Sequence, residues 1–307
     1  MSRRPEIALG PLPFNWDADR RRAFYARVAD TPAIDTVYLG EVVCLKRQPL
    51  VAEAMGEAVE TLVNAGKRVI HSAPALVLTD AEREHLAALA ESGEPVEAND
   101  PGALYHLAGR AHHVGPWVNV YNESTLRFLA DRGAASICLP PELPGDSVRT
   151  LARTAGEAGV TAEAQGFGRL PLAISARCYH ARAHGLTRDS CRYVCGEDPD
   201  GLPVGTLDGD RFLAVNGPEV LSDACGLVVH ELPDLVAAGV GRVRLSPHAT
   251  DMAAVAHHYA ALLEGSATAA GTDAALRPHL PAAPANGFLH GTAGLAWIGP
   301  EGAGPEP

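Results

Sequence analysis

The sequence has no long hydrophobic run. Although 47% of its 307 residues are hydrophobic, no apolar stretch approaches the roughly 18–20 residues that a membrane-spanning helix needs. The first residues, Met1–Glu6, include two arginines but no apolar stretch follows them, so we expect no secretory signal peptide. Self-similarity at a period of about 20–50 residues is also missing, which argues against a repeat protein. These absences predict a cytoplasmic protein with one sizeable core.

Basic residues are in the minority. The 25 Lys and Arg residues against 37 Asp and Glu give a net charge of −12. Binding to a phosphate backbone needs a basic face, so nucleic acid is not an expected partner. Six cysteines are too few for a disulfide scaffold in a chain of this length. In a reducing compartment they are buried small side chains, metal ligands or nucleophiles.

Common catalytic motifs are missing as well. The sequence contains no Gly-x-Ser-x-Gly, no His-Glu-x-x-His, no Walker A loop and no Gly-x-Gly-x-x-Gly. The pairs His112-His113 and His257-His258 are expected at the surface rather than as metal ligands. Cys138 lies within an apolar run and is expected in the core, whereas the surroundings of Cys225 favour no role.

Short β-rich runs alternate with longer helical patterns along most of the chain. The expected strands are 7–9, 34–39, 68–71, 95–98, 117–121, 135–139, 160–164 and 242–245. Helical crossovers between strands make the strands parallel. The pattern therefore predicts an α/β fold of the (β/α)8, TIM-barrel-like type, closed or incomplete. An open doubly wound sheet is the alternative.

One region interrupts this alternation. Residues 166–230 are rich in Gly, Pro and Asp and hold four of the six cysteines. We interpret them as a cysteine-containing insertion late in the barrel, within a barrel-like domain that covers residues 1–265. Residues 266–307 are expected to form a linker and a C-terminal tail, frayed from about residue 299.

Polar side chains follow several expected strands. In parallel α/β folds the active site lies at the carboxyl ends of the strands. Glu41 follows the second strand and Glu163 ends the seventh, while Asn119 and Tyr121 end the fifth. These residues are candidates to line a pocket, with Glu163 and Glu41 as candidate catalytic residues. The alternative is that they are ordinary cap and turn residues.

Four cysteines could meet at one cavity. Cys178, Cys191 and Cys195 follow one another as Cys-x12-Cys-x3-Cys, and Cys44 lies at the carboxyl end of an expected strand. Four thiolates can hold a zinc ion or an iron–sulfur cluster. Only Cys191 and Cys195 have the spacing usual for structural zinc, whereas a cluster held by scattered loops tolerates irregular spacing. Chance proximity or core packing is the alternative.

Several motifs together resemble the collagenase-like peptidase family. They are the run Tyr38–Glu41 followed by Cys44, the run Leu170–Cys178, the Cys191/Cys195 pair and Arg244–Pro247. The likeness covers roughly residues 8–265 and is closer to the UbiV-like branch, which serves ubiquinone biosynthesis.

The resemblance implies a barrel-like fold and a 4Fe–4S cluster. Matched motif by motif, its ligands would be Cys44, Cys178, Cys191 and Cys195. It also implies a heterodimer with a homologous UbiU-like subunit and a lipid-carrier-like accessory protein. The pair would support oxygen-independent hydroxylation of a ubiquinone precursor, with prephenate as the source of the hydroxyl group. The chain would then be the iron–sulfur subunit of a hydroxylase.

One segment departs from the family pattern. Peptidase-like and RNA-hydroxylating relatives carry Glu-x-Phe-x-His-Gly before the cysteine region, where this chain has Glu163–Gly168 with Phe167 at the histidine position. Phenylalanine neither transfers protons nor binds metal, which weakens a peptidase interpretation. The cysteine pattern is also compatible with an RNA-hydroxylation protein of the same family and with a zinc-stapled binding module.

Overall fold

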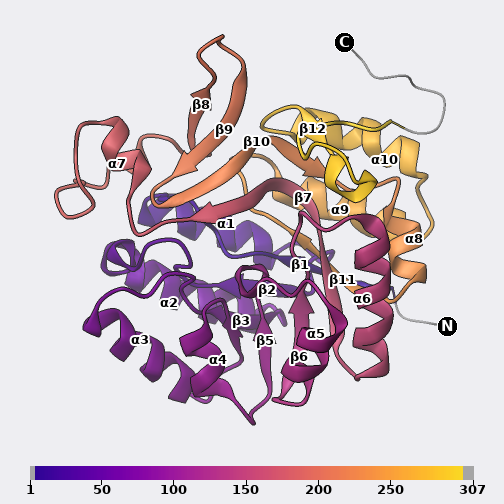
Figure 1. The fold of residues 1–307 in the computed structure, drawn as a ribbon, viewed down its shortest axis with the longest axis horizontal. Helices are drawn as coiled ribbons and strands as arrows, with labels where there is room; N and C mark the ends of the chain where they lie inside the picture. The colour runs from indigo at the N-terminus through magenta and orange to yellow at the C-terminus, as the bar shows by residue number, and fades with distance from the viewer. Residues whose placement is uncertain (1–3, 300–307) are drawn as a thin grey trace.

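A computed structural model describes residues 4–299 and contains a closed barrel of eight parallel strands (Figure 1). These are β1 (Glu6–Leu9), β2 (Thr36–Leu39), β3 (Arg68–Ser72), β4 (Val96–Ala98), β5 (His112–Val114), β6 (Ala134–Cys138), β7 (Thr161–Ile174) and β11 (Val240–Leu245). Strand β11 closes the barrel, because Val243 lies opposite Ile7 of β1 on one side and Ala164 of β7 on the other. The predicted TIM-barrel-like fold is confirmed in its closed form.

Helices connect the barrel strands and pack around them. They are α1 (Ala18–Ala29), α2 (Gln48–Asn64), α3 (Asp80–Glu91), α4 (Pro101–Leu107), α5 (Glu123–Ala130), α6 (Gly145–Glu157), α8 (Leu232–Ala237) and α9 (Met252–Leu263). Local sequence explains where several begin: Thr79 and Glu82 form the capping box of α3, and Asn122 caps α5. The apolar helix faces bury the outward side chains of the strands in one large core.

The fifth strand differs from the prediction. The sequence predicts a strand over 117–121, but β5 is His112–Val114, and a short 3-10 helix, η2 (Pro116–Val118), follows it. Pro116 has no backbone N–H to donate to a sheet. Asn119 then takes the left-handed conformation, with φ 60°, and ends any extended run. The expectation that His112 and His113 lie at the surface is therefore wrong, since both are part of the barrel wall.

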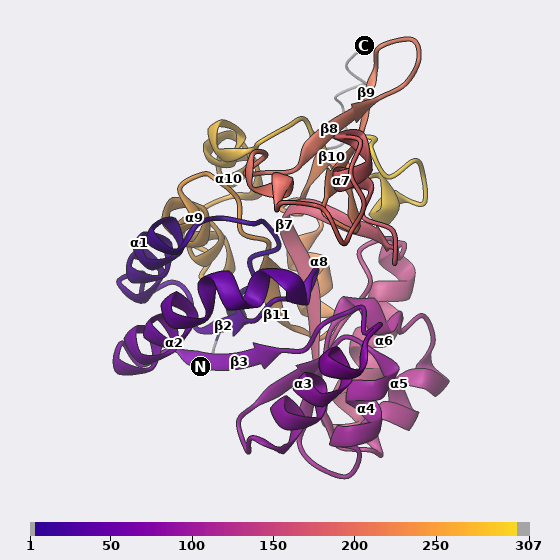
Figure 2. The same cartoon turned by 90° about the vertical axis from the view of Figure 1, so that its left-hand side faces the viewer.

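Strand β7 continues beyond the barrel into the insertion. Its outer half pairs antiparallel with β10 (Glu219–Leu227), which pairs with β9 (Arg211–Asn216), which pairs with β8 (Leu202–Gly205). Figure 2 shows the β8–β9 hairpin projecting away from the barrel, with α7 (Tyr179–Ala183) on the same side. Two short 3-10 helices, η1 (Leu45–Arg47) and η3 (Val194–Gly196), accompany the cysteine-containing loops.

The segment after α9 contains further helices and a short strand. Expected as a linker and tail, it contains α10 (Ala269–Leu276), η4 (Arg277–His279), β12 (Pro284–Ala285) and η5 (Gly287–His290). Helix α10 packs against α9, and β12 pairs in parallel with β10. Of the expected frayed end, residues 299–307, all but the first residue lie outside the described residues. Within residues 4–299, no helix combines the length and the apolar character needed to cross a membrane.

Candidate functional site

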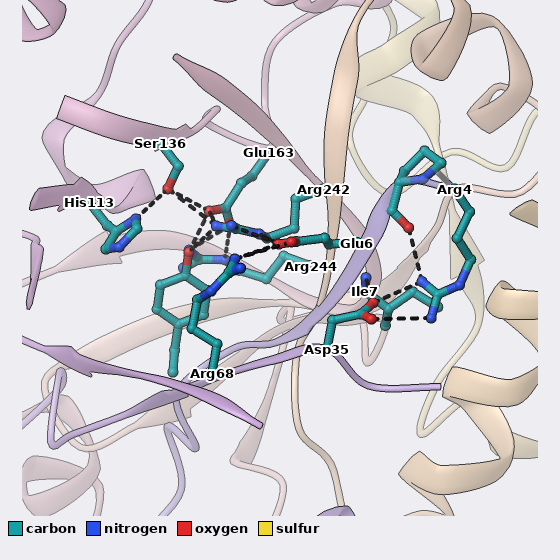
Figure 3. Close-up of polar contacts among 12 residues, drawn as sticks. Arg4, Glu6, Ile7, Asp35, Arg68, His113, Ser136, Glu163, Arg242 and Arg244 are labelled. Carbon is teal, nitrogen blue, oxygen red and sulfur yellow. Dashed lines mark hydrogen bonds and ion pairs between the residues drawn. The ribbon is translucent and has the colours of Figure 1, made fainter. Parts of the chain in front are cut away.

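Charged side chains fill the interior of the barrel around Glu163 (Figure 3). Side chains alternate along a strand, so Glu163 of β7 points inward while its neighbour Ala164 joins the outer core. One Glu163 carboxylate oxygen accepts from Arg242 at 2.5 Å and from Ser136 at 2.8 Å, and also from Tyr38. The other oxygen accepts from Arg244 at 2.8 Å. Both oxygens are therefore engaged by donors from four other strand positions.

The same network extends to two further carboxylates. Arg244 lies 2.6 Å from Glu97 of β4, and Arg242 lies 2.8 Å from Glu6 of β1. The Arg244 guanidinium also lies over the ring of Tyr38, 3.8 Å from its centroid. Each buried arginine thus faces two carboxylates, which compensates for the cost of removing the charges from water.

Titration in the barrel interior follows from this pairing. Burial by itself would raise the pKa of Glu163, but Arg244 and Arg242 outweigh it and lower that pKa to about 2. Burial lowers the pKa of His113 to about 4, so this imidazole is neutral. Burial and the nearby Glu163 raise the pKa of Tyr38. Glu163 is therefore a fixed anion, with all of its surface buried.

A cavity opens above this network, at the carboxyl ends of the barrel strands; we call it the mouth cavity. Its walls are largely apolar, and they include Phe14, Val42, Val43, Trp117 and Leu221. Its polar lining consists of Glu97, Asn99, Gln165, Arg169, Glu219, Arg244 and His248, with Ser246 beside them. Arg244 is shared with the interior network, whereas Glu163 itself does not line the cavity. A few polar groups within apolar walls are typical of a small-molecule site.

Two buried amide oxygens at the mouth cavity have no hydrogen-bond partner among residues 4–299. They are Oδ1 of Asn99 and Oε1 of Gln165. The Asn99 amide nitrogen donates to the Ala73 carbonyl and to Glu97, both at 3.1 Å, which fixes the amide so that its oxygen remains free. Buried polar atoms are normally paired. A ligand with hydrogen-bond donors would satisfy both oxygens.

His248 lies in the loop after β11 and also lines the mouth cavity. Its Nε2 accepts from the backbone N–H of Arg169 at 3.0 Å, which assigns the ring proton to Nδ1, 3.3 Å from an Asp200 carboxylate oxygen. Burial lowers the pKa of His248, although Asp200 opposes this effect. Both ring nitrogens are engaged, so His248 holds Arg169 and strand β7 in place.

Glu41 lies apart from the mouth cavity. It is 7% exposed and accepts from the backbone N–H of Cys44 at 3.2 Å. Its carboxylate lies 3.6 Å from Arg47 and 3.8 Å from Arg21. Burial raises the pKa of Glu41, and the two arginines oppose this shift. The structure therefore places Glu41 beneath the Cys44 loop, where it fixes that loop and orients Arg47.

The four cysteines singled out in the sequence line one small cavity, the thiol cavity. These are Cys44, Cys178, Cys191 and Cys195. Cys44 directly precedes η1, Cys178 caps α7 by accepting from the Ala181 N–H at 3.4 Å, and Cys195 lies in η3. All six cysteines of the chain are free thiols. Residues 4–299 contain no set of three or more His, Cys, Asp or Glu side chains arranged to ligate a single metal ion.

Backbone strain shapes the loop between Cys191 and Cys195. Arg192 and Tyr193 both adopt left-handed conformations, with φ of 47° and 57°. Such conformations cost of order 1 kcal/mol or more for residues other than glycine and persist where the surroundings demand them. Here they turn the chain tightly enough for both cysteines to face the same cavity.

Positive charge surrounds the thiol cavity. Lys46, Arg47 and Arg188 line it, and Lys46 Nζ lies 4.0 Å from Cys191 Sγ. Arg188 also donates to Glu82 of α3 at 2.7 Å, which ties the insertion to the barrel helices. Burial raises the pKa of the Cys44 thiol, and it raises that of Cys178, with Cys195 adding to the effect. A bound cationic group would favour their deprotonation.

The remaining predicted candidates lie elsewhere. Asn119 and Tyr121 do not line the mouth cavity, and the exposed Tyr121 hydroxyl donates to the Glu142 carboxylate. Cys138 is fully buried inside the barrel, as predicted for a core residue, and burial raises its pKa to about 12. Cys225 is fully buried in β10, outside the thiol cavity.

Sequence reasoning missed Arg169, Glu219 and His248, which line the mouth cavity. Arg169 and Glu219 fall within the segment interpreted as an insertion, and its pairing with the outer half of β7 is what brings them over the barrel. His248 follows the Ser246-Pro247 stop of the last strand, and that position was the available signal.

Comparison with known proteins gives a family match over most of the chain and several similar solved structures. A family model described as peptidase family U32 matches residues 20–296. Among solved structures, an uncharacterized B. cereus protein has 11% identity over 79% of this chain and 61% of that one, with a TM-score of 0.41. A mandelate racemase/muconate lactonizing protein from Paracoccus denitrificans has 13% identity over 55% and 48%, with a TM-score of 0.39. The chain thus spans less than two thirds of either protein.

A third solved structure is covered almost completely. Dihydropteroate synthase from Thermus thermophilus has 14% identity over 85% of this chain and 93% of that one, with a TM-score of 0.42. All three TM-scores are below 0.5, so the fold assignment depends on the strand pairing of this chain itself.

Proposed function

Because the chain belongs to peptidase family U32, we propose that it is the iron–sulfur subunit of an oxygen-independent hydroxylation system in ubiquinone biosynthesis. This is the role of the UbiV-like branch that its sequence resembles. The observation that carries the proposal is the convergence of Cys44, Cys178, Cys191 and Cys195, from two distant parts of the chain, on one cavity. Chance packing of four thiols does not account for the three cationic side chains around that cavity.

The donor set suits a 4Fe–4S cluster. Four thiolates are the usual ligands of such a cluster. Lys46, Arg47 and Arg188 would offset the negative charge of the cluster–thiolate unit, as hydrogen-bond donors and cations near the sulfurs do in tuning such centres. When bound, the cluster would supply one-electron chemistry.

The mouth cavity is the proposed site for the ubiquinone precursor. Its apolar walls suit an aromatic ring, and the free oxygens of Asn99 and Gln165 would accept from ring hydroxyl groups. Phe167 supports this interpretation over proteolysis, since the histidine of the peptidase-like pattern is missing there. The proposed partners are a homologous UbiU-like subunit and a lipid-carrier-like protein, with prephenate as hydroxyl source and the cytoplasm as location.

Metal analysis of anaerobically purified protein tests the cluster. We expect about four iron and four sulfide per chain, and loss of most of both in Cys191→Ala. Cys225→Ala is the matched control, because Cys225 is a buried free thiol outside the thiol cavity. One zinc and no iron would favour the zinc-stapled module, and no metal after reconstitution would contradict both.

Quinone analysis of anaerobically grown cells tests the pathway. Cells that carry Cys191→Ala should lose ubiquinone made without oxygen, while Cys225→Ala cells should retain it. Normal ubiquinone from an iron-free variant would refute a role for the cluster. Loss of an RNA hydroxylation with ubiquinone unchanged would favour the RNA-modifying function.

A further inference from the structure

Glu219 is a buried acid at the mouth cavity that neither the sequence motifs nor the proposed cluster ligands include. It is the first residue of β10, is 3% exposed and lines the cavity. One of its carboxylate oxygens accepts from Asn216 Nδ2 at 2.9 Å. It has no ion-pair partner within 4.0 Å among the described residues, unlike Glu163, Glu97 and Glu41.

Asn216 connects Glu219 to the wall of the thiol cavity. The Asn216 side-chain oxygen accepts from Arg47 Nη2 at 3.0 Å. Both side chains also donate to the Pro13 carbonyl, each at 2.7 Å, which fixes their relative positions. Arg47 and Asn216 are each 1% exposed. A continuous hydrogen-bonded path of three side chains therefore joins the two cavities.

The Arg47 side chain also interacts with the thiols of the thiol cavity. It lines the thiol cavity. Burial lowers the pKa of Arg47, but Glu41, Cys195 and Cys44 more than offset this and raise it. Arg47 thus shares its positive charge between the thiol cavity and the Asn216–Glu219 pair.

We propose that Glu219 is the proton-exchanging residue of the mouth cavity, and that Arg47 and Asn216 make its proton affinity depend on the charge of the thiol cavity. The second half of this inference rests on the proposed function, because a bound cluster is what gives the thiol cavity a variable charge.

The surroundings of Glu219 agree with that role. Burial raises the pKa of Glu219 to about 7, while Asn216 and Arg47 oppose the rise and Glu41 adds to it. An acid with such a pKa exchanges protons near neutral pH. The charged and titratable groups that face it across the cavity or through Arg47 are Glu41, Arg47, Glu97, Arg169, Arg244 and His248.

The coupling has a defined direction. An external one-electron reductant makes the thiol cavity more negative by one charge. The positive charge of Arg47 is then offset more strongly by the thiol cavity, so Arg47 stabilises the ionised Glu219 carboxylate less. The pKa of Glu219 then rises, and the carboxylate takes up one proton from solvent near pH 7. One electron and one proton enter, so the combined charge of the two cavities is conserved.

Difference infrared spectroscopy of the carboxylic-acid band tests the first half. In the purified chain we expect a band that titrates near pH 7, that is lost in Glu219→Gln and that is retained in the control Glu84→Gln, since Glu84 is exposed on α3. The same titration in metal-free protein separates this result from the fate of the cluster. A band that persists in Glu219→Gln, or Glu219 ionised throughout pH 5–8, would overturn the assignment.

Repeating the titration before and after dithionite reduction tests the second half. In cluster-loaded protein the midpoint should rise on reduction by up to about one pH unit. Asn216→Ala should reduce this rise without changing iron content. Arg47→Lys, which keeps the charge but loses the planar set of guanidinium donors, should also reduce the rise. A midpoint rise in both variants as large as that in the wild type would refute coupling through Arg47 and Asn216. Failure to load any cluster would overturn the coupling and the proposed function together, while the Glu219 assignment would stand on the metal-free titration.

Discussion

The barrel interior and the mouth cavity both contain buried polar side chains, but these are paired in the interior and partly unpaired at the mouth. Inside the barrel, every carboxylate faces an arginine, and both oxygens of Glu163 are engaged. At the mouth, Asn99 and Gln165 keep unpaired oxygens, and Glu219 has an amide as its partner instead of a cation. Saturated polar groups specify a structure, whereas unsaturated ones are available to a ligand. The boundary between scaffold and site therefore passes between Glu163 and Gln165, two residues apart on one strand.

The largest effect should come from breaking the interior network. Glu163→Gln leaves Arg242 and Arg244 with less compensation in a buried site, which should cost about 3–5 kcal/mol of unfolding free energy. Urea denaturation at pH 7 measures it. The control is Glu157→Gln, since Glu157 pairs with Arg127 at 3.0 Å on the surface and should cost less than about 1 kcal/mol. Equal losses of unfolding free energy in both variants would contradict the difference between the buried network and the surface ion pair.

Acid should remove much of the same energy without a mutation. The pKa of Glu163 is lowered to about 2 in the folded chain, against about 4.3 when unfolded. Its stabilisation is thus present above about pH 4.3 and lost as the pH falls toward 2, by about 3 kcal/mol. Denaturation curves from pH 5 to pH 2 should show a steeper loss in the wild type than in Glu163→Gln. Parallel curves would mean that Glu163 is not held as an anion.

Glu219 should give a pH dependence of the opposite sign. Its pKa is raised to about 7, so its contribution to stability is full below about pH 4.3 and is lost as the pH rises to about 7. Glu219→Gln should therefore be more stable than the wild type at pH 8, by up to about 4 kcal/mol, and similar to it at about pH 4. A variant that is less stable than the wild type at pH 8 would show that the ionised carboxylate is needed by the fold.

The smallest stability effect is expected at Gln165. Its Oε1 has no partner among residues 4–299, and replacing an unpaired polar group by an apolar one of similar shape is nearly neutral. Gln165→Leu should change the unfolding free energy by less than about 1 kcal/mol. It should, however, weaken binding of a phenolic ubiquinone-precursor analogue, measured by calorimetry. A large loss of stability with unchanged binding would place Gln165 in the scaffold.

Sequence patterns predict the barrel well where they are local. Strand β2 is an apolar run, and β11 alternates apolar residues with Arg242 and Arg244. Both strands have clear stops, Gly40 after the first and Ser246-Pro247 after the second, and both lie within two residues of their predicted limits. Strand β5 is short and contains two histidines, so its apolar signal is weaker than that of the following segment. Tertiary pairing with β4 and β6 outweighs that local preference.

The candidate site is less predictable because its geometry is non-local. The spacing of Cys191 and Cys195 is visible in the sequence, and so is the position of Cys44 at a strand end. Whether the Glu163 carboxylate is paired depends on Arg242 and Arg244, which lie about eighty residues later in the chain. They meet Glu163 because β11, which follows the whole insertion, pairs with β7. No local pattern reveals which carboxylate such arginines will neutralise.

Strand β7 also sets the distance between the charged interior and the mouth cavity. It extends over 14 residues as one strand, from the barrel wall into the sheet of the insertion. At about 3.3 Å per residue, the two steps from Glu163 to Gln165 carry the chain roughly 7 Å from the charged interior to the lining of the mouth cavity. A one-residue insertion there would not merely lengthen a loop. It would turn the side chains beyond it to the opposite face. Both the depth of the cavity and the residues that line it therefore depend on the number of residues in this part of β7.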